Sequence, residues 1–251
     1  MPRFFRKIRS DLMEKNKTAN YLKYAIGEIV LVVIGILIAL QINNWNENRK
    51  SNLIAKEVYA NLLTSLVQDS IEVHRIIDLL SKSVKTQSNL ILNESKMQSM
   101  EFNQDELDSL IGDILSGVMS FFPKTGVYEL ITSNNSLDLL KSEQIKSLLI
   151  NLYDFQYKRY ENIDALLDHK YHNELNSLIR EKIKLVGTFN SETEFTILSH
   201  ADYNRFKEHY EELVSECRDS YGMLSTANAY LIQIRQSIEE LIELIRMELR
   251  K

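Results

Sequence analysis

The hydrophobic residues of the chain gather first in one unbroken stretch near the N-terminus. It covers residues 24–42, and from Ile29 to Leu40 it contains no polar side chain. As a helix this stretch would span about 28 Å, close to the roughly 30 Å hydrocarbon core of a bilayer. Tyr24 and Trp45 lie at its two ends, where amphipathic rings prefer the membrane interface. The pattern therefore predicts a transmembrane helix over residues 24–42.

Two other kinds of segment share part of this pattern. A helix in the core of a soluble protein is rarely apolar on every side over such a length. A cleaved signal peptide has a shorter apolar region followed by small residues, and Ala39-Leu-Gln41 fits such a cleavage site poorly. An uncleaved anchor is the favoured interpretation.

Three residues inside the segment are candidate contacts with a transmembrane partner. Glu28 lies about one turn inside the basic end, where a carboxylate in hydrocarbon is costly. It either reaches the interface, paired with Lys23 or lipid headgroups, or makes a polar contact with another helix. Gly35 and Ala39 form a small-xxx-small pair, which permits close approach of two helices.

Beyond residue 43 the apolar residues recur every three or four positions, as they do on one face of a helix. Residues 50–90 fit one long helix that continues outward from the span, with Asn43 to Asn46 as the place where it would break. The other expected helices cover residues 104–116, 142–186 and about 200–251. Gly187 is a natural stop for the second of these.

The last expected helix carries a seam of coiled-coil type. Its heptad row is Cys217, Leu224, Leu231, Ile238 and Ile245, and a second row three residues on is Ala227, Ile234 and Leu241. Long helices joined by brief loops predict an elongated antiparallel bundle with coiled-coil-like packing.

The composition supports an all-α fold. Gly and Pro together make 9 of 251 residues, whereas ordinary usage would give about 12%. This scarcity excludes the turn-rich β architectures, and the only strand candidates are residues 187–190 and 194–198. The single Cys217 excludes an intrachain disulfide framework and a cysteine zinc cluster.

The charge of the chain is divided unevenly along its length. Residues 1–23 carry seven basic and two acidic side chains, so they contribute +5, and the remaining residues must sum to −10 because the whole chain is −5. The basic side chains that surround the apolar stripe of this arm are Arg3, Arg6, Lys7 and Arg9. Such an amphipathic arm suits an anionic membrane surface. The positive-inside rule places the arm in the cytoplasm and residues 43–251 in the periplasm of a bacterium.

Catalytic motifs are missing from the sequence. It has no phosphate-binding loop, dinucleotide fingerprint, nucleophile elbow or zincin motif. His169 and His172, with Glu174 nearby, would bind a metal only weakly, and a solvated pair on an amphipathic helix is the simpler interpretation. Cys217 fits a small core residue better than a nucleophile. We expect no catalytic residue, cofactor or metal.

One aromatic segment stands apart from the helical pattern. Two glycines bracket Pro123, and Phe121, Phe122 and Tyr128 lie close to it in the sequence. These four residues are either packing residues at a helical corner or a recognition edge for a peptide or small ligand. Tyrosines are also frequent in the 142–186 and 200–251 helices. Some of them are expected to be exposed or to lie at a protein interface, where tyrosine is enriched.

The first 140 residues contain specific sequence motifs in addition to their hydrophobic pattern. It includes Phe4-Phe-Arg-Lys-Ile-Arg9, residues 23–50 with Gln41-Ile-Asn-Asn-Trp45, and more loosely Phe122-Pro-Lys-Thr-Gly-Val-Tyr128 and Ser136-Leu-Asp-Leu-Leu140. These residues resemble an uncharacterised bacterial membrane family, domain of unknown function 6090. The resemblance implies a short single-pass envelope protein with no activity to transfer. It also adds Gln41 to the candidate contacts with a transmembrane partner.

The sequence therefore predicts a non-enzymatic envelope protein of the bacterial inner membrane, acting as an interaction or scaffold subunit of a membrane complex. Its expected partners are membrane lipid and another membrane or envelope protein, or a second copy of the chain, and not nucleic acid. The alternative is a periplasmic ligand-sensing bundle that signals through a partner protein. A metal-dependent enzyme comes third.

Overall fold

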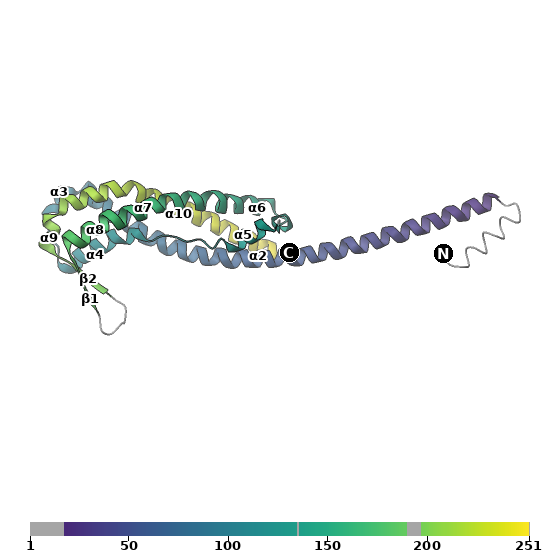
Figure 1. Ribbon diagram of the computed structural model, residues 1–251, viewed down its shortest axis with the longest axis horizontal. Coiled ribbons are helices and arrows are strands. Elements are labelled where there is room, and N and C mark those ends of the chain that lie inside the picture. The colour runs from purple at the N-terminus through teal and green to yellow at the C-terminus, as the bar shows by residue number, and fades with distance from the viewer. Residues whose placement is uncertain (1–17, 135, 190–196, 251) are drawn as a thin grey trace. The chain divides into compact units, whose positions relative to one another are not determined.

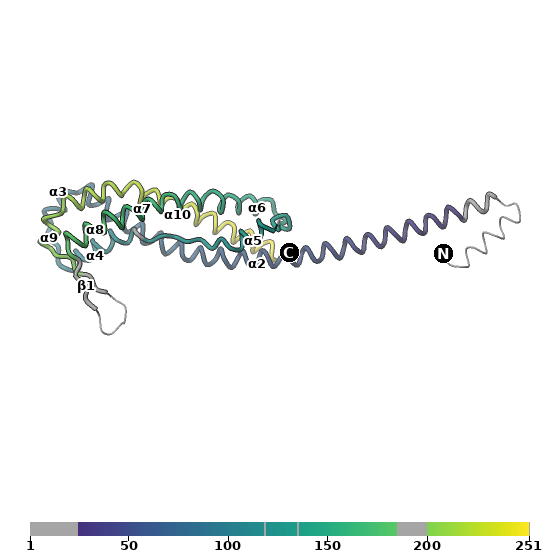
Figure 2. Tube along the Cα trace, viewed as in Figure 1, coloured from purple at the N-terminus to yellow at the C-terminus, as the bar shows by residue number. Residues whose placement is uncertain are grey.

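The computed structural model describes residues 18–134, 136–189 and 197–250, and Figure 2 traces the path of the chain. The chain divides into two compact units, Met1–Lys56 and Glu57–Lys251. Helix α2 (Thr18–Leu92) begins in the first unit and ends in the second. It has no break at Asn43 to Asn46, which the sequence analysis named as the place where the long helix would break.

The first unit consists, in its described part, of the N-terminal part of α2. Every large apolar side chain from Ile29 to Ile42 is exposed there. The helix contains an 18-residue window with a mean hydropathy of 2.6, none of which is buried. Helix α2 is therefore long and apolar enough to cross a membrane.

The second unit is built almost entirely of helices, which confirms the predicted all-α class. Besides α2, its α-helices are α3 (Glu94–Ser99), α4 (Gln104–Leu115), α5 (Gly126–Ser133), α6 (Glu143–Ile150), α7 (Tyr157–Lys170), α8 (Asn176–Leu178), α9 (Tyr203–Glu208) and α10 (Tyr210–Leu249). Short 3-10 turns cover Ser116–Val118 and Ser136–Leu139. Figure 1 shows α7 and α10 lying side by side.

The predicted 142–186 helix is a continuous helical stretch over residues 143–183, but it is not uniformly α-helical. Its α segments, α6, α7 and α8, are joined and ended by three π-helical turns, at Asn151–Gln156, Tyr171–Leu175 and Ile179–Ile183. The stretch ends before Gly187. That glycine lies instead in strand β1 (Leu185–Phe189), which pairs antiparallel with β2 (Ile197–Ala201). The described residues of the two strand candidates, 187–189 and 197–198, therefore lie in these two paired strands.

The 57–92 part of α2 and the 143–183 stretch run in the same direction. The hydroxyl of Tyr157 donates to Asp69 at 3.3 Å, and the hydroxyls of Tyr171 and Ser83 are 3.2 Å apart. Both pairs are separated by 88 residues along the chain, and a constant separation arises only when two helices are parallel. The chain makes the return between them through residues 93–142.

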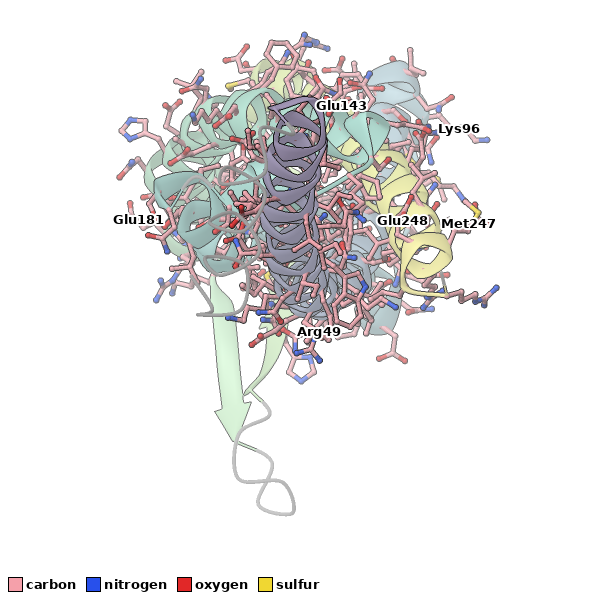
Figure 3. The ribbon with its side chains drawn as sticks, turned by 90° about the vertical axis from the view of Figure 1, so that its right-hand side faces the viewer. Arg49, Lys96, Glu143, Glu181, Met247 and Glu248 are labelled. Atoms are coloured by element: carbon pink, nitrogen blue, oxygen red, sulfur yellow. The ribbon has the colours of Figure 1, made fainter. Side chains whose placement is uncertain are left out.

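Helix α10 runs antiparallel to the 57–92 part of α2. From Ser81 to Gln87 on α2, the hydrogen-bond partner on α10 moves back along the chain from Asn228 to Ser220. The bundle is thus antiparallel where α10 packs on its neighbours. Its core is continuous, and both predicted rows of α10 are buried: Cys217, Leu224, Leu231, Ile238, Ile245, Ala227, Ile234 and Leu241. In Figure 3, charged side chains such as Lys96 and Glu181 lie at the rim of the bundle.

Lys184 ends the 143–183 stretch with a backbone φ of 56°, in the left-handed region. A side chain is disfavoured there, and glycine is the residue that this conformation suits. We expect Lys184→Gly to stabilise the bundle by about 0.5–1 kcal/mol. Arg180→Gly, an exposed change inside the same helical stretch, is the matched control and should destabilise it by about 1 kcal/mol. Guanidinium denaturation of the two variants checks this, and equal destabilisation by both would contradict the strain at Lys184.

Candidate functional site

A buried carboxylate holds the extended segment 119–125 against α2. Asp69 is 0% exposed, and both of its carboxylate oxygens accept a hydrogen bond from the backbone N–H of Lys124, each at 3.1 Å. The Tyr157 hydroxyl donates to the same group at 3.3 Å, and Lys124 Nζ lies 3.7 Å from Oδ1. Burial raises the pKa of the Asp69 carboxyl, and the contacts with Lys124 and Tyr157 oppose that rise. Asp69 therefore links α2, the 119–125 segment and α7.

A second polar contact fixes the same segment on α7. The backbone N–H of Phe121 donates to the Tyr160 hydroxyl at 3.3 Å, and that hydroxyl donates in turn to Asp164 at 2.8 Å. Burial raises the pKa of Asp164, and its hydrogen bonds with Tyr160 and Ser120 oppose the shift. The segment is thus attached through backbone groups at two points, so its side chains are held in place.

Aromatic rings fill the space between these two attachment points. Tyr128 of α5 stacks on Tyr153 with ring centroids 4.3 Å apart and planes inclined by 7°. Tyr153 meets Tyr157 edge-on at 5.0 Å, and Phe121 meets Tyr157 at 5.8 Å and Tyr160 at 6.2 Å. Such pairs add about 0.5–1.5 kcal/mol each beyond area burial, and together these rings form an aromatic wall.

A cavity of about 450 Å³ opens beside this wall. It lies among the 119–125 segment, α5, the π-helical turn at Asn151–Gln156 and α7. Its lining residues are Phe121, Phe122, Pro123, Thr125, Tyr128, Glu129, Thr132, Tyr153, Asp154, Tyr157, Lys158, Tyr160, Glu161 and Asp164. The lining thus combines aromatic rings with carboxylates and a single lysine.

The tyrosine hydroxyls of the cavity stay protonated. Burial raises the pKa of Tyr128, Tyr153, Tyr157 and Tyr160 above the ordinary value of 10.0. The Tyr128 hydroxyl donates to Asp154 at 2.7 Å, and this contact lowers the pKa of the Asp154 carboxyl. The hydroxyl protons of Tyr128, Tyr157 and Tyr160 are therefore already donated to carboxylates. The site contains an ionised carboxylate, and it offers no tyrosinate that would act as a base at neutral pH.

All four residues of the predicted aromatic edge line this one cavity. Phe121 and Tyr128 are buried, whereas Phe122 is 79% exposed and Pro123 is half-buried. The structure therefore brings the four together, with two of them packed in the core and two at the surface. Their role in recognition stays a prediction.

Sequence reasoning missed Asp69, although its position carried a signal. It lies on the apolar stripe of α2, three residues after Leu66 and four before Val73, both of which are 0% exposed. A charged residue on a buried face requires a partner.

Some tyrosines were expected to be exposed or to lie at a protein interface, and none of those in the 143–183 stretch is exposed. Tyr153, Tyr157, Tyr160 and Tyr171 are all buried. The first three follow one another at i, i+4 and i+7, which places them on the same helical face. Phe155 is the aromatic residue between them that points away, and it is 57% exposed.

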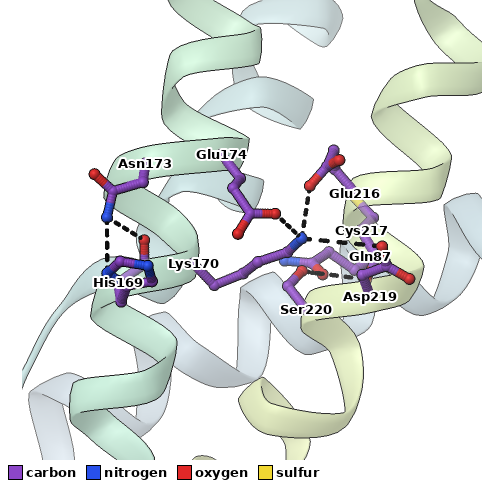
Figure 4. Close-up of polar contacts among 9 residues, drawn as sticks. All are labelled: Gln87, His169, Lys170, Asn173, Glu174, Glu216, Cys217, Asp219 and Ser220. Carbon is purple, nitrogen blue, oxygen red and sulfur yellow. Dashed lines mark hydrogen bonds and ion pairs between the residues drawn. The ribbon is translucent and has the colours of Figure 1, made fainter.

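A second polar cluster joins α7 to α10 (Figure 4). The Lys170 ammonium pairs with Glu174, lies 2.8 Å from Glu216 and is 3.9 Å from Asp219. Cys217 is buried beside it, and burial raises the pKa of its thiol to about 12. The lysine is 11% exposed and surrounded by its counter-charges. This cluster is therefore an ion-pair network in which the ammonium is largely buried and the carboxylates are partly or well exposed.

The histidine pair does not converge on a common point. His172 lies 3.2 Å from Asp168, and His169 contacts Asn173, while Glu174 is taken by Lys170. Within the described ranges, no group of three or more potential metal ligands from His, Cys, Asp and Glu comes together.

The predicted membrane contacts lie on the first unit. Glu28 is half-buried, Ala39 and Gln41 are exposed, and a Cβ atom added to Gly35 would meet nothing within 4 Å. Trp45 is 67% exposed, and Tyr24 lies within α2. The predicted interface residues Arg3, Arg6, Lys7 and Arg9 lie outside the described residues.

Comparison with known protein families gives a match. The model of a family of unknown function, DUF6090, matches residues 28–205. This range includes most of the apolar segment, α4, the aromatic cavity and the β hairpin. No curated protein and no solved structure matches the chain.

Proposed function

The chain belongs to the family of unknown function DUF6090, and we propose that it is a non-enzymatic, membrane-anchored envelope protein. In this proposal it acts as an interaction subunit of a membrane complex. The apolar part of α2 anchors the chain and contacts a partner, and the helical bundle of residues 57–251 docks or senses outside the membrane.

The observation that carries this proposal is the exposure of an apolar helix on every side. None of the 18-residue window with hydropathy 2.6 is buried. Soluble proteins rarely expose a continuous apolar surface larger than a few hundred Å², and a helix of this length and character is stable in hydrocarbon. A lipid bilayer is an environment that would cover the apolar surface of this helix.

The charge distribution supports an orientation. Residues 1–23 carry a net charge of +5, with seven basic and two acidic side chains. Basic residues flanking a span remain on the cytoplasmic side. We therefore place the N-terminus in the cytoplasm of a bacterium, the span in its inner membrane and the bundle in the periplasm.

The surface of the span supports a helical partner. Gly35 and Ala39 are one helical turn apart and expose backbone that a second helix can approach closely. Glu28 and Gln41 add polar groups near the two ends of the segment. A lipid anchor requires only hydrophobicity, so these residues favour a protein contact.

Anchoring and orientation are tested with the full chain expressed in a bacterium with two membranes. In a Cys217→Ala background, single cysteines are placed by Ser10→Cys and Glu101→Cys. We expect the chain to sediment with membranes after alkaline carbonate extraction. An impermeant maleimide should label residue 101 in intact spheroplasts and residue 10 only after lysis. Extraction by carbonate, or labelling at residue 10 in intact spheroplasts, would contradict the proposal.

Ligand sensing is the second candidate function, and the aromatic cavity is the observation that favours it. The cavity is bordered by polar groups and lies between elements of the bundle. A sensor of this kind would transmit its signal through a partner protein.

A further inference from the structure

We propose that the aromatic cavity binds an organic ammonium group, that is, a protonated amine carried on a short apolar chain. This inference goes beyond anchoring and stands whether or not the span inserts in a membrane, because every residue of the cavity belongs to the Glu57–Lys251 unit.

The wall of the cavity suits the apolar part of such a ligand. Tyr128 and Tyr153 are stacked, and Tyr157 and Phe121 meet edge-on beside them. Phe122 is 79% exposed at the same cavity. Aromatic faces hold methylene groups by burial and hold ammonium groups through the ring quadrupole.

The charge of the rim selects a cation. Four carboxylates and one lysine line the cavity. Lys158 pairs with Asp154 at 3.2 Å, and Asp164 accepts the Tyr160 hydroxyl. Glu129 and Glu161 are both exposed, and in the described part of the chain neither has an ion-pair partner. Two carboxylates without counter-charges beside an aromatic wall attract a cation and repel an anion.

The aromatic wall also contains a buried polar group without a partner. The Tyr153 side chain is 4% exposed, and its hydroxyl has no hydrogen-bond partner among the described residues. Leaving a buried hydroxyl unpaired costs about 1–3 kcal/mol. The volume of about 450 Å³ also falls within the range of roughly 300–1,000 Å³ that is typical of small-ligand pockets.

The same lining argues against an inorganic cation. Calcium and magnesium require six or more oxygen ligands in a closed shell, whereas much of this wall is aromatic carbon. An ammonium group needs only a few carboxylates and gains from the rings. The chemistry of the wall therefore selects an organic cation.

The test uses three probes with the same five-carbon chain and different ends: 1,5-diaminopentane, 1,5-pentanediol and glutarate. The full chain is titrated in a maltoside detergent, which has no ammonium group of its own, and binding is measured by calorimetry. We expect the diamine to bind and the diol and the dicarboxylate not to bind. Failure of the diamine to bind at about 10 mM, or equal binding of diamine and diol, would overturn the proposal.

Variants locate the binding in the cavity. The double variant Glu129→Gln with Glu161→Gln should weaken diamine binding about tenfold, and Phe122→Ala should weaken it about threefold. Glu101→Gln makes one such substitution at an exposed position outside the cavity and should leave affinity unchanged. Equal weakening by Glu101→Gln would overturn the proposal. Nuclear magnetic resonance of the unmodified chain gives a second readout, because the diamine should shift tyrosine ring signals and the diol should not.

The source of the amine is distinguished by a second pair of probes. A short peptide with one internal lysine is compared with the same peptide carrying glutamine. Tighter binding of the lysine peptide than of the free diamine would identify a protein side chain as the ligand, and the reverse order would identify a free amine. Either order supports the ammonium site, and equal binding of the lysine and glutamine peptides together with no diamine binding would overturn it. Failure here leaves membrane labelling unaffected, so the two proposals fail separately.

Discussion

Replacing Asp69 with alanine is expected to destabilise the bundle by about 3 kcal/mol. The change removes the acceptor of the part-buried Lys124 backbone N–H and of the buried Tyr157 hydroxyl, in the contact that fixes the 119–125 segment. An orphaned buried donor costs about 1–3 kcal/mol, and the lost volume at a fully buried position adds to this. Guanidinium denaturation in maltoside micelles, followed by the near-ultraviolet circular dichroism of the tyrosines, measures the change.

The matched control for this variant lies on the same helix. Asp78→Ala removes an exposed carboxylate from α2, and it should change stability by no more than about 0.5 kcal/mol. If the two variants lose the same stability, Asp69 does not anchor the segment. Diamine binding should also weaken in Asp69→Ala, because the segment carries Phe121 and Phe122.

The raised pKa of Asp69 gives the anchor a pH dependence with a definite sign. Because burial raises the pKa from its ordinary value of 3.8, the folded state binds the proton more readily than the unfolded state. The stability that Asp69 contributes is then fully present below pH 3.8 and is lost as the pH rises through the higher folded pKa. Asn at this position does not titrate. Asp69→Asn should therefore reduce the free energy of unfolding most in acid and less toward neutral pH. If the stability lost in Asp69→Asn grows as the pH rises, the contacts with Lys124 and Tyr157 lower the pKa of Asp69 by more than burial raises it.

Replacing Gly117 with alanine is expected to destabilise the bundle by about 1–3 kcal/mol, the usual effect of overpacking. A Cβ atom there would lie 2.3 Å from the Tyr171 hydroxyl and 2.8 Å from Ser83 Oγ. The Tyr171 hydroxyl also accepts from Gln87 at 2.6 Å, so the ring has little freedom to move. Denaturation of the variant measures the loss.

Two further variants separate crowding from a backbone effect. Gly112→Ala, in the interior of α4, meets nothing within 4 Å, and it should stabilise the bundle by about 0.5–1 kcal/mol. Tyr171→Phe removes the nearest of the crowding atoms, so Gly117→Ala should cost less in that background, with a coupling energy of about 1 kcal/mol. Strictly additive losses would contradict the close approach at Gly117.

Local patterns in the sequence predicted most of the helices because each rests on a few neighbouring residues. Asn103 caps the start of α4 through a capping box. Its side chain accepts a hydrogen bond from the backbone N–H of Glu106, and the Glu106 carboxylate accepts one from the backbone N–H of Asn103. The rows through Leu224 and Ala227 are buried because a seven-residue repeat keeps one face toward the core. The scarcity of glycine and proline predicted long helices for the same local reason.

Long-range features were beyond the reach of the pattern. The contact between Asp69 and Lys124 joins residues that are 55 positions apart, and no local periodicity encodes it. The end of the 143–183 stretch was also missed, because Lys184 adopts a left-handed conformation and ends the stretch before Gly187, where the sequence placed the stop. The aromatic edge at Phe121 to Tyr128 was recognised, but the carboxylates facing it come from α5, α7 and the π-helical turn before α7. The aromatic residues and these carboxylates line one cavity only because the elements that carry them pack together.

The central claim is that the chain works by contacting another membrane or envelope protein. Its most direct test is affinity purification of the full chain in mild detergent, with the mass and stoichiometry of the complex measured. We predict a stoichiometric membrane partner or a defined oligomer that is retained in Glu101→Gln and reduced in a Glu28→Leu, Gly35→Leu, Ala39→Leu variant. Reproducible recovery of the unmodified chain as a monomer would contradict the account.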